Sequence, residues 1–327
     1  MQLIRSLLLP LLIPCLAIAQ GIRLEDFDYP FPVANYAFES QGVELEMTYM
    51  DVSPEETPKG TVVLLHGKNF SGAYFEETAS ALLAAGYRVV MPDQIGFGKS
   101  SKPAHYQYSF QQLAKNTHDL LESIGVEKAQ VLGHSMGGMV ATRFALMYPE
   151  MTESLTLLNP IGLEDWKAKG VPYVSIDQWY QSELKKTADK IKAYQLDSYY
   201  DGVWKEAYDP WVELLAKFIE SPDYPRMAWN QALTYDMIFT QPVVYEFSDI
   251  KVPTLLIIGQ RDTTALGKNL VSPEKKAQLG NYPELGRAAQ AAIPGAQLVE
   301  LEGLGHLPHI EAFDRFWTPY FEFLDSQ

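Results

Sequence analysis

The chain has 327 residues, of which 47% are hydrophobic and 20% are charged. These values are typical of a globular protein and exclude both a disordered chain and a polytopic membrane protein. The sequence contains 26 Lys and Arg against 41 Asp and Glu, a formal net charge of -15 at pH 7. Because phosphate binding needs clustered Lys and Arg, this balance argues against a nucleic-acid partner.

The first twenty residues have the pattern of a secretory signal peptide. A basic residue precedes an apolar stretch, residues 7–18, and Ala17-Ile18-Ala19 supplies small residues at a cleavage site. The stretch is shorter than the roughly 20 apolar residues of a membrane span, and two prolines interrupt it. We therefore expect residues 1–19 to be removed on export to the periplasm or the cell exterior, with no stable membrane span left afterwards.

Cys15 is the only cysteine in the sequence. Leu12-Ile13-Pro14-Cys15 loosely resembles a lipoprotein cleavage box, but proline stands where a small residue usually precedes the cysteine. Lipid attachment is therefore a minor alternative to simple cleavage. The mature chain would contain no cysteine, which excludes disulfides and thiolate metal ligands.

After the signal peptide, short apolar stretches alternate with helical patterns. Residues 22–40 are predicted to form an irregular arm, and residues 42–52 an early strand. Further strands are predicted at 61–67, 87–93, 129–133, 154–160, 252–262 and 296–303, and helices at 76–86, 109–125, 136–149 and 311–324. Strands that are nearly continuous Val, Leu and Ile, alternating with helices, predict an α/β fold: a mostly parallel sheet with helices on both faces.

The alternation stops between Pro160 and Phe247, where the sequence is helical and has no convincing buried strand. Five of the six tryptophans fall in this region, at positions 166, 179, 204, 211 and 229. We therefore predict a helical cap, residues 160–247, inserted into a core formed by residues 20–159 and 248–327. An aromatic-rich cap favours a small-molecule substrate with an apolar portion, although the same tryptophans could simply pack the cap onto the core.

Residues 131–140, VLGHSMGGMV, place a serine between a predicted strand and a predicted helix. The pattern Gly-x-Ser-x-Gly in that context predicts a nucleophile elbow, a turn so sharp that Gly133 and Gly137 must lack side chains. Ser135 would then lie above the carboxyl edge of the sheet, close to the N-terminus of a helix that favours developing negative charge.

A nucleophilic serine needs a histidine base and an acid that orients it. Asp262 follows the strand at 252–262, and His306 follows the strand at 296–303. The order Ser135, Asp262, His306 along the chain is the order expected for this elbow. Asp165, shortly after an earlier strand, is an alternative acid.

The other histidines have structural interpretations. His134 adjoins the serine and is predicted to pack internally, His118 lies on a helix surface, and His309 is a turn residue. His306 and His309 resemble a metal pair only superficially, since no cysteine or acid-rich partner completes a site. The sequence therefore predicts neither a metal nor a cofactor.

A tetrahedral intermediate also needs backbone donors for its oxyanion. The amide of Met136, directly after the serine, is one candidate. The second is the amide of Lys68, in the loop after the strand at 61–67, with Asn69 as a weaker alternative.

The stretches LLHG, PDQIGFGKS, GHSMGG, IIGQRD and GLGHLPHIE occur in this order, and together they resemble the α/β-hydrolase superfamily over nearly the whole mature chain. The resemblance implies a catalytic Ser135, an acid at Asp262, a base at His306 and no cofactor. It also implies that the insertion is the family's cap. Serine at the nucleophile position excludes the aspartate-based mechanisms of haloalkane dehalogenases and epoxide hydrolases.

The expected function is that of an exported serine hydrolase that cleaves a carboxylic ester or lactone. Two alternatives remain open: a carbon–carbon bond hydrolase with the same three residues, and a non-enzymatic binder on the same fold.

Overall fold

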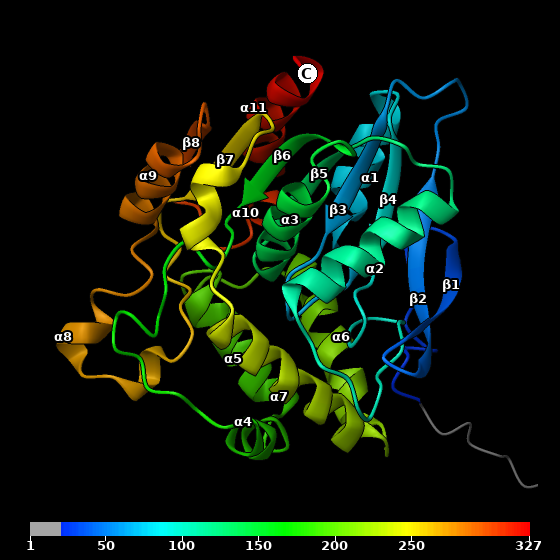
Figure 1. Cartoon of the computed structure of the whole chain (residues 1–327). Helices are drawn as coiled ribbons and strands as arrows, with labels where there is room; N and C mark the ends of the chain where they lie inside the picture. The colour runs from blue at the N-terminus through cyan, green and yellow to red at the C-terminus, as the bar shows by residue number, and fades with distance from the viewer. Residues whose placement is uncertain (1–20) are drawn as a thin grey trace, which may run out of the picture.

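The computed structural model describes residues 21–327, so the predicted signal peptide and Cys15 lie outside the described residues. Its centre is an eight-stranded sheet with the order β1-β2-β4-β3-β5-β6-β7-β8 (Figure 1). The strands are β1 Val33–Ser40, β2 Val43–Val52, β3 Thr61–Leu65, β4 Arg88–Pro92, β5 Ala129–His134, β6 Thr152–Leu158, β7 Thr254–Gly259 and β8 Gln297–Leu301. β1 and β2 run antiparallel to their neighbours, and the six other strands are parallel.

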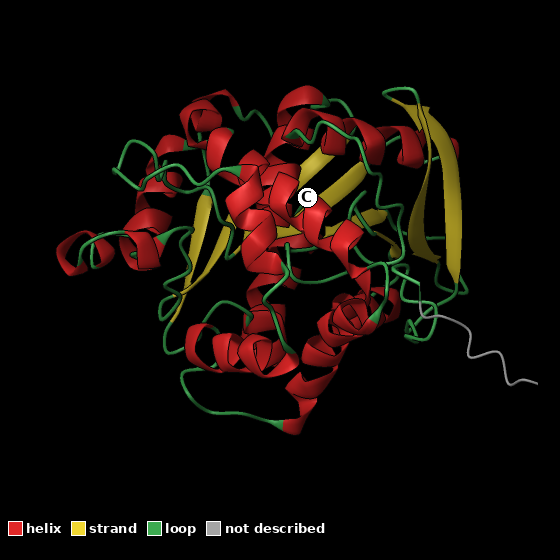
Figure 2. Ribbon diagram, turned by 90° about the horizontal axis from the view of Figure 1, so that it is seen from below, coloured by secondary structure: helices red, strands yellow, loops and turns green. Residues whose placement is uncertain are grey.

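Helices cover both faces of this sheet (Figure 2). Around the sheet lie α1 Glu76–Ala84, α2 Phe110–Ser123, α3 Met136–Met147, α8 Pro273–Lys276, α9 Tyr282–Ala292, α10 Pro308–Glu311 and α11 Phe313–Asp325. Between β6 and β7 lie α4 Ile176–Glu183, α5 Ala188–Ser198, α6 Asp209–Glu220 and α7 Tyr224–Thr240. Short 3₁₀ turns occupy Gly72–Phe75, Glu206–Tyr208, Val244–Asp249 and Lys268–Leu270.

The central strands are buried on both faces because successive side chains point in opposite directions. In β3, Val63 and Leu65 join an apolar cluster with α2, α3 and α9, whereas Val62 and Leu64 join one with α1 and α11. This arrangement explains the near-continuous apolar runs in the sequence. The predicted α/β-hydrolase fold, with a mostly parallel sheet, is confirmed.

The prediction of an irregular arm over residues 22–40 was wrong for β1. Val33–Ser40 pairs antiparallel with β2, and the two strands join through Gln41 and Gly42, both with positive φ (55° and 72°). A two-residue turn of this kind matches the twist of a hairpin. The strand is mostly exposed at the edge of the sheet, so it lacks the apolar pattern on which the prediction relied.

The residues before β1 connect the core with the inserted helices. Ile22 and Leu24 pack in an apolar cluster with residues of α6 and α7, namely Leu214, Phe218, Tyr224, Met227 and Ala228. The backbone carbonyl of Leu24 accepts a hydrogen bond from Lys99 Nζ at 2.8 Å. We call residues 22–29 the N-terminal arm.

The inserted helices α4–α7 lie together on one side of the molecule, next to the carboxyl ends of the parallel strands (Figure 1). Their place between β6 and β7 agrees with a cap insertion, and the exact division of the chain at residues 160 and 247 stays a prediction. Within residues 21–327, no helix combines the length and the apolar character that crossing a bilayer demands.

Candidate active site

Ser135 lies in a strained turn between β5 and α3, with φ 55° and ψ -121°. Positive φ is unusual for a residue with a side chain and is found at functional turns. A Cβ atom on Gly133 would stand 2.2 Å from the carbonyl oxygen of Gly137, and one on Gly137 would stand 2.0 Å from that of Leu65. Both distances forbid a side chain, so the two glycines allow the turn that presents Ser135.

His306 joins Ser135 to Asp262 through its two ring nitrogens. Its Nε2 lies 3.0 Å from Ser135 Oγ, and its Nδ1 lies 2.7 Å from Asp262 Oδ2. All three residues are buried. With the proton on Nδ1, the ring donates to the carboxylate and leaves Nε2 to accept from the serine hydroxyl, which is the arrangement of a Ser-His-Asp triad.

Two further groups fix the carboxylate of Asp262. Asn159 Nδ2 and the Thr264 amide each donate to it at 2.8 Å. Burial would raise the pKa of Asp262, but His306 and these hydrogen bonds together lower it below its ordinary value. The acid is therefore ionised when the histidine becomes protonated. Asn159, which has φ 38° at the end of β6, was not identified from the sequence.

The alternative acid, Asp165, makes different contacts. Its carboxylate caps the Lys167 amide at 2.9 Å and accepts from the Tyr245 hydroxyl at 2.9 Å. The structure thus places Asp262, and not Asp165, against His306.

The loop after β3 runs directly beside the serine. A Cβ atom on Gly67 would stand 3.0 Å from Ser135 Cβ, so only glycine lets the backbone pass this closely. In the turns, loops and helix caps of residues 21–327, neither the Met136 amide nor the Lys68 amide donates to a backbone carbonyl. Their role as oxyanion donors stays a prediction that this arrangement allows. The side chain of the weaker alternative, Asn69, donates instead to the Tyr199 hydroxyl at 3.1 Å.

Three of the other histidines are buried around the site. His134 Nε2 donates to the backbone carbonyl of His306 at 2.7 Å, so this residue positions the base. His309 is buried among aromatic rings, and neither ring nitrogen has a partner within residues 21–327. His66 Nε2 accepts from the Gln94 amide at 3.0 Å. Burial lowers the pKa of each of them, that of His309 to about 3, so all three are neutral at pH 7.

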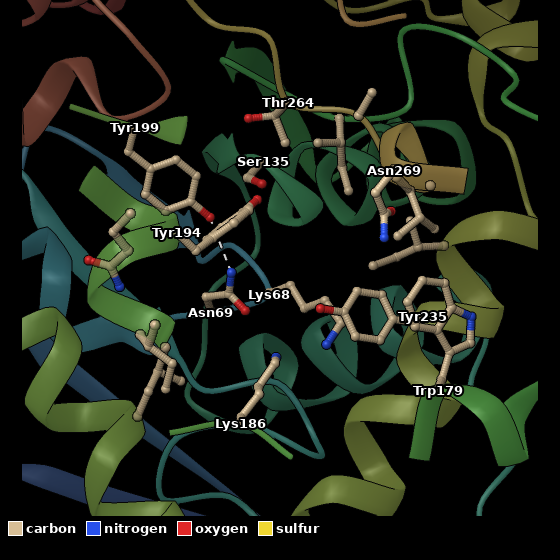
Figure 3. A pocket seen from close by; sticks show the side chains of 18 of the residues that line it. Lys68, Asn69, Ser135, Trp179, Lys186, Tyr194, Tyr199, Tyr235, Thr264 and Asn269 are labelled. Atoms are coloured by element: carbon tan, nitrogen blue, oxygen red, sulfur yellow. Dashed lines mark hydrogen bonds between the residues drawn. The ribbon is translucent and has the colours of Figure 1, made fainter. Parts of the chain in front are cut away.

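Ser135 opens onto a cavity of about 320 Å³ between the sheet and the inserted helices (Figure 3). Of the five tryptophans in the insertion, Trp166 and Trp179 line the cavity. The others pack elsewhere; Trp229, for example, donates to the Ala104 carbonyl at 3.2 Å. The lining also includes Ile161, Ile191, Leu215, Ile238, Leu266, Tyr194, Tyr199 and Tyr235. The cavity is therefore mainly apolar, as expected for a small-molecule site.

One cluster outside the site has the composition of a metal site. His118, Asp119 and Glu122 on α2 have ligand atoms within 4.8 Å of one another. Asp119 is already paired with Lys115, and the His118 ring stacks on Tyr148 with 3.9 Å between ring centroids. These contacts agree with the surface interpretation of His118.

Residues 60–313 match the family model described as alpha/beta hydrolase fold, so the chain belongs to the α/β-hydrolase family of hydrolytic enzymes. A crystal structure of a probable hydrolytic enzyme from Pseudomonas aeruginosa PAO1 is 54% identical and superposes with a TM-score of 0.92. The match covers 94% of this chain and 98% of that one.

Two curated relatives are more distant. Lipase 1 of Psychrobacter immobilis is 28% identical over 261 residues, which are 77% of this chain and 73% of the lipase. The 2-hydroxy-6-oxononadienedioate/2-hydroxy-6-oxononatrienedioate hydrolase of Comamonas testosteroni is 27% identical over 245 residues, 70% of this chain and 82% of the relative. The family thus includes hydrolases of more than one bond type.

Proposed function

We propose that this protein is a serine hydrolase that cleaves a carboxylic ester or a lactone through an acyl-enzyme intermediate. The observation that carries the proposal is the continuous hydrogen-bond chain from Ser135 Oγ through His306 to Asp262, at 3.0 and 2.7 Å. The strained elbow that presents the serine and the cavity in front of it support the same function.

In the acylation step, Ser135 Oγ attacks the carbonyl carbon while its proton passes to His306 Nε2. The Met136 and Lys68 amides stabilise the negative charge on the carbonyl oxygen. The C–O bond of the ester then breaks, and the departing alcohol takes the proton from His306. A water molecule, activated by the same histidine, attacks the acyl-enzyme and releases the acid and the free serine.

The apolar cavity supports a substrate with an apolar portion next to the reacting carbonyl. The test is hydrolysis of 4-nitrophenyl acyl esters from acetate to laurate by the mature protein and by Ser135→Ala. We expect turnover that depends on Ser135, with an optimum chain length set by the cavity. Equal inactivity of both proteins would overturn the ester proposal.

A carbon–carbon bond hydrolase with the same three residues is the second candidate, because the chain is similar to the Comamonas testosteroni enzyme. Turnover of vinylogous diketone acids without turnover of simple esters would favour it. The third alternative, a non-enzymatic binder, predicts that an organophosphonate probe fails to label Ser135.

The proposal includes export of the protein. Its support is the pattern of residues 1–19 in the sequence. Mass spectrometry of the protein from a periplasmic extract should find an N-terminus at Gln20, and an intact Met1 there would contradict cleavage.

A further inference from the structure

The charged residues that line the cavity all carry the same sign. They are Lys68, Lys186 and Lys190, and no Asp or Glu is present among the described residues that line it. This is unexpected in a chain whose acidic residues outnumber its basic ones by 41 to 26. The lining of the cavity is therefore basic, in contrast to the acidic composition of the chain.

Lys68 is the least compensated of the three. It is buried, its ammonium lies 3.6 Å from the centre of the Tyr235 ring, and it donates to Gln231 Oε1. Lys68 makes no ion pair within residues 21–327. Burying a charge without an opposite charge is costly. Burial lowers the pKa of Lys68 well below its ordinary value. The charge of Glu183 raises this pKa, and the charge of Lys186 lowers it, but burial is the largest effect.

Lys186 points toward the same part of the cavity (Figure 3). Glu183 is buried, and its carboxylate forms an ion pair with the Lys186 ammonium at 2.7 Å. Lys186 is therefore paired with a carboxylate, whereas Lys68 has no ion-pair partner within residues 21–327. The buried Nε2 of Gln231, the residue that accepts from Lys68, has no acceptor within residues 21–327. Gln231 is not among the residues that line the cavity, so the feature that the cavity presents is the basic pair Lys68 and Lys186.

The position of Lys68 relates this charge to the reaction. Its backbone directly follows Gly67, which passes beside Ser135, and its side chain extends along the cavity toward Tyr235 (Figure 3). An anion on the ammonium would thus lie about the length of one lysine side chain from the reacting carbonyl, a separation of a few carbon atoms.

We infer that Lys68 and Lys186 form a carboxylate subsite, and that the substrate is an ester carrying a free carboxylate a few carbons from the scissile bond. This inference rests on the proposed function and names its substrate class. The carboxylate would supply the opposite charge that Lys68 lacks. Hydrogen bonds to charged groups of this kind discriminate strongly against neutral analogues.

The experiment compares each acid with its neutral amide, which has almost the same size. One arm uses monoethyl adipate against ethyl 6-amino-6-oxohexanoate, with the charge on the acyl part. The other uses 4-acetoxybutyrate against 4-acetoxybutyramide, with the charge on the alcohol part. We expect kcat/KM to favour the acid about 10-fold or more in one arm, which also tells on which side of the bond the charge lies. A ratio near one in both arms would overturn the inference.

Two variants test the lysines. Lys68→Met, which keeps the length of the side chain, should bring the ratio of acid to amide close to one, and Lys186→Gln should reduce it. The matched control is Lys192→Met: Lys192 lies on α5, pairs with Asp209 at 3.0 Å and does not line the cavity. If Lys68 only tied the loop to Gln231, its replacement would lower the melting temperature and leave the ratio unchanged.

Binding separates this inference from the proposed function. Calorimetric titration of Ser135→Ala with monoethyl adipate and with its amide measures the preference without turnover, and loss of the preference in Ser135→Ala/Lys68→Met is the expected result. Turnover of 4-nitrophenyl butyrate without any preference for acids would contradict only the carboxylate subsite. Absence of all ester turnover would contradict the proposed function. The titration would still show whether the cavity prefers the acid to its amide.

Discussion

The two walls of the cavity are built in different ways. On the core side, Ser135 lines the cavity, and hydrogen bonds of 3.0 Å or less connect it to His306 and Asp262 at other strand ends. On the side of the inserted helices, ring faces dominate: Trp179 stacks on Tyr235 with 4.5 Å between centroids. Directional bonds fix atoms within tenths of an ångström, whereas stacked rings define a shape and a polarity. If the proposed function holds, we expect the core side to determine the reaction and the side of the inserted helices to determine which substrates fit.

The largest expected effect comes from the core side. Asp262→Asn should keep the fold but lower kcat about 10⁴-fold, because the amide cannot hold the histidine in the required tautomer. Steady-state kinetics on a 4-nitrophenyl ester measures this. The matched control is Asp165→Asn, whose carboxylate accepts from the Tyr245 hydroxyl and from nearby amides, and kcat should change less than about 2-fold. A large loss in the control alone would reassign the acid.

Replacing a glycine in the core and a glycine among the inserted helices should lower the free energy of unfolding by different amounts. Gly137→Ala should lower the free energy of unfolding by about 3 kcal/mol or more, because the new Cβ would meet the Leu65 carbonyl at 2.0 Å. Gly202, in a turn between inserted helices, has φ 74° and no atom within 4 Å of an added Cβ. Gly202→Ala should cost only the strain of the left-handed conformation, about 1–2 kcal/mol. Urea unfolding gives both values, and equal losses would contradict the contrast.

The core side should also make stability depend on pH. The pKa of His309 is about 3 in the folded protein, against an ordinary value of 6.5, so the unfolded chain binds the additional proton between these values. Stability should therefore fall as the pH drops below about 6.5, by at most about 2 kcal/mol from this residue at pH 5.

His309→Phe tests this pH dependence, because the two nitrogens of His309 are unpartnered and the surrounding rings can accept a phenyl group. Urea midpoints at pH 7.5 and pH 5 should differ less in the variant than in the wild type. His134 is also buried with a lowered pKa, so part of the slope should persist. Identical slopes in the two proteins would contradict the assignment.

The smallest effect is expected on the helical side. Trp179→Ala removes a ring that lines the cavity, so longer acyl chains should gain relative to shorter ones by about 10-fold in kcat/KM. The 4-nitrophenyl ester series measures the shift. Tyr173→Ala is the control, because this exposed tyrosine does not line the cavity. An unchanged optimum in Trp179→Ala would show that the core side alone sets the fit.

Local sequence patterns predicted most strands of the sheet and residues that stand at their ends. The strands β3 to β7 were predicted because burial on both faces demands continuous apolar runs. The positions of Asp262 and His306 could be inferred because the carboxyl ends of parallel strands meet at one edge of the sheet. The structure brings these two residues and Ser135 together, while their catalytic roles stay predictions.

Features that depend on tertiary packing were not predicted. Asn159 directly follows β6, the strand beside β7, and donates to Asp262; nothing in its local sequence distinguishes it from an ordinary strand-end turn. The ring of Tyr199 stacks on His306 with 4.9 Å between centroids. Tyr199 belongs to the insertion, and the sequence around it has no apolar periodicity that would predict the direction of its side chain. The basic lining of the cavity likewise combines Lys68 with Lys186, which is far from it in the sequence.

The N-terminal arm has a consequence for the order in which the molecule assembles. Ile22 and Leu24 are among the first residues of the described chain, yet their apolar partners in α6 and α7 are synthesised nearly two hundred residues later. Contacts so distant in sequence require loop closure at an entropic cost before they stabilise the chain. The arm contacts both the inserted helices and the core, so we expect it to stabilise their association once these helices have folded. We therefore expect a chain that lacks the residues before Tyr29 to keep its sheet and to hold the inserted helices less firmly over the cavity.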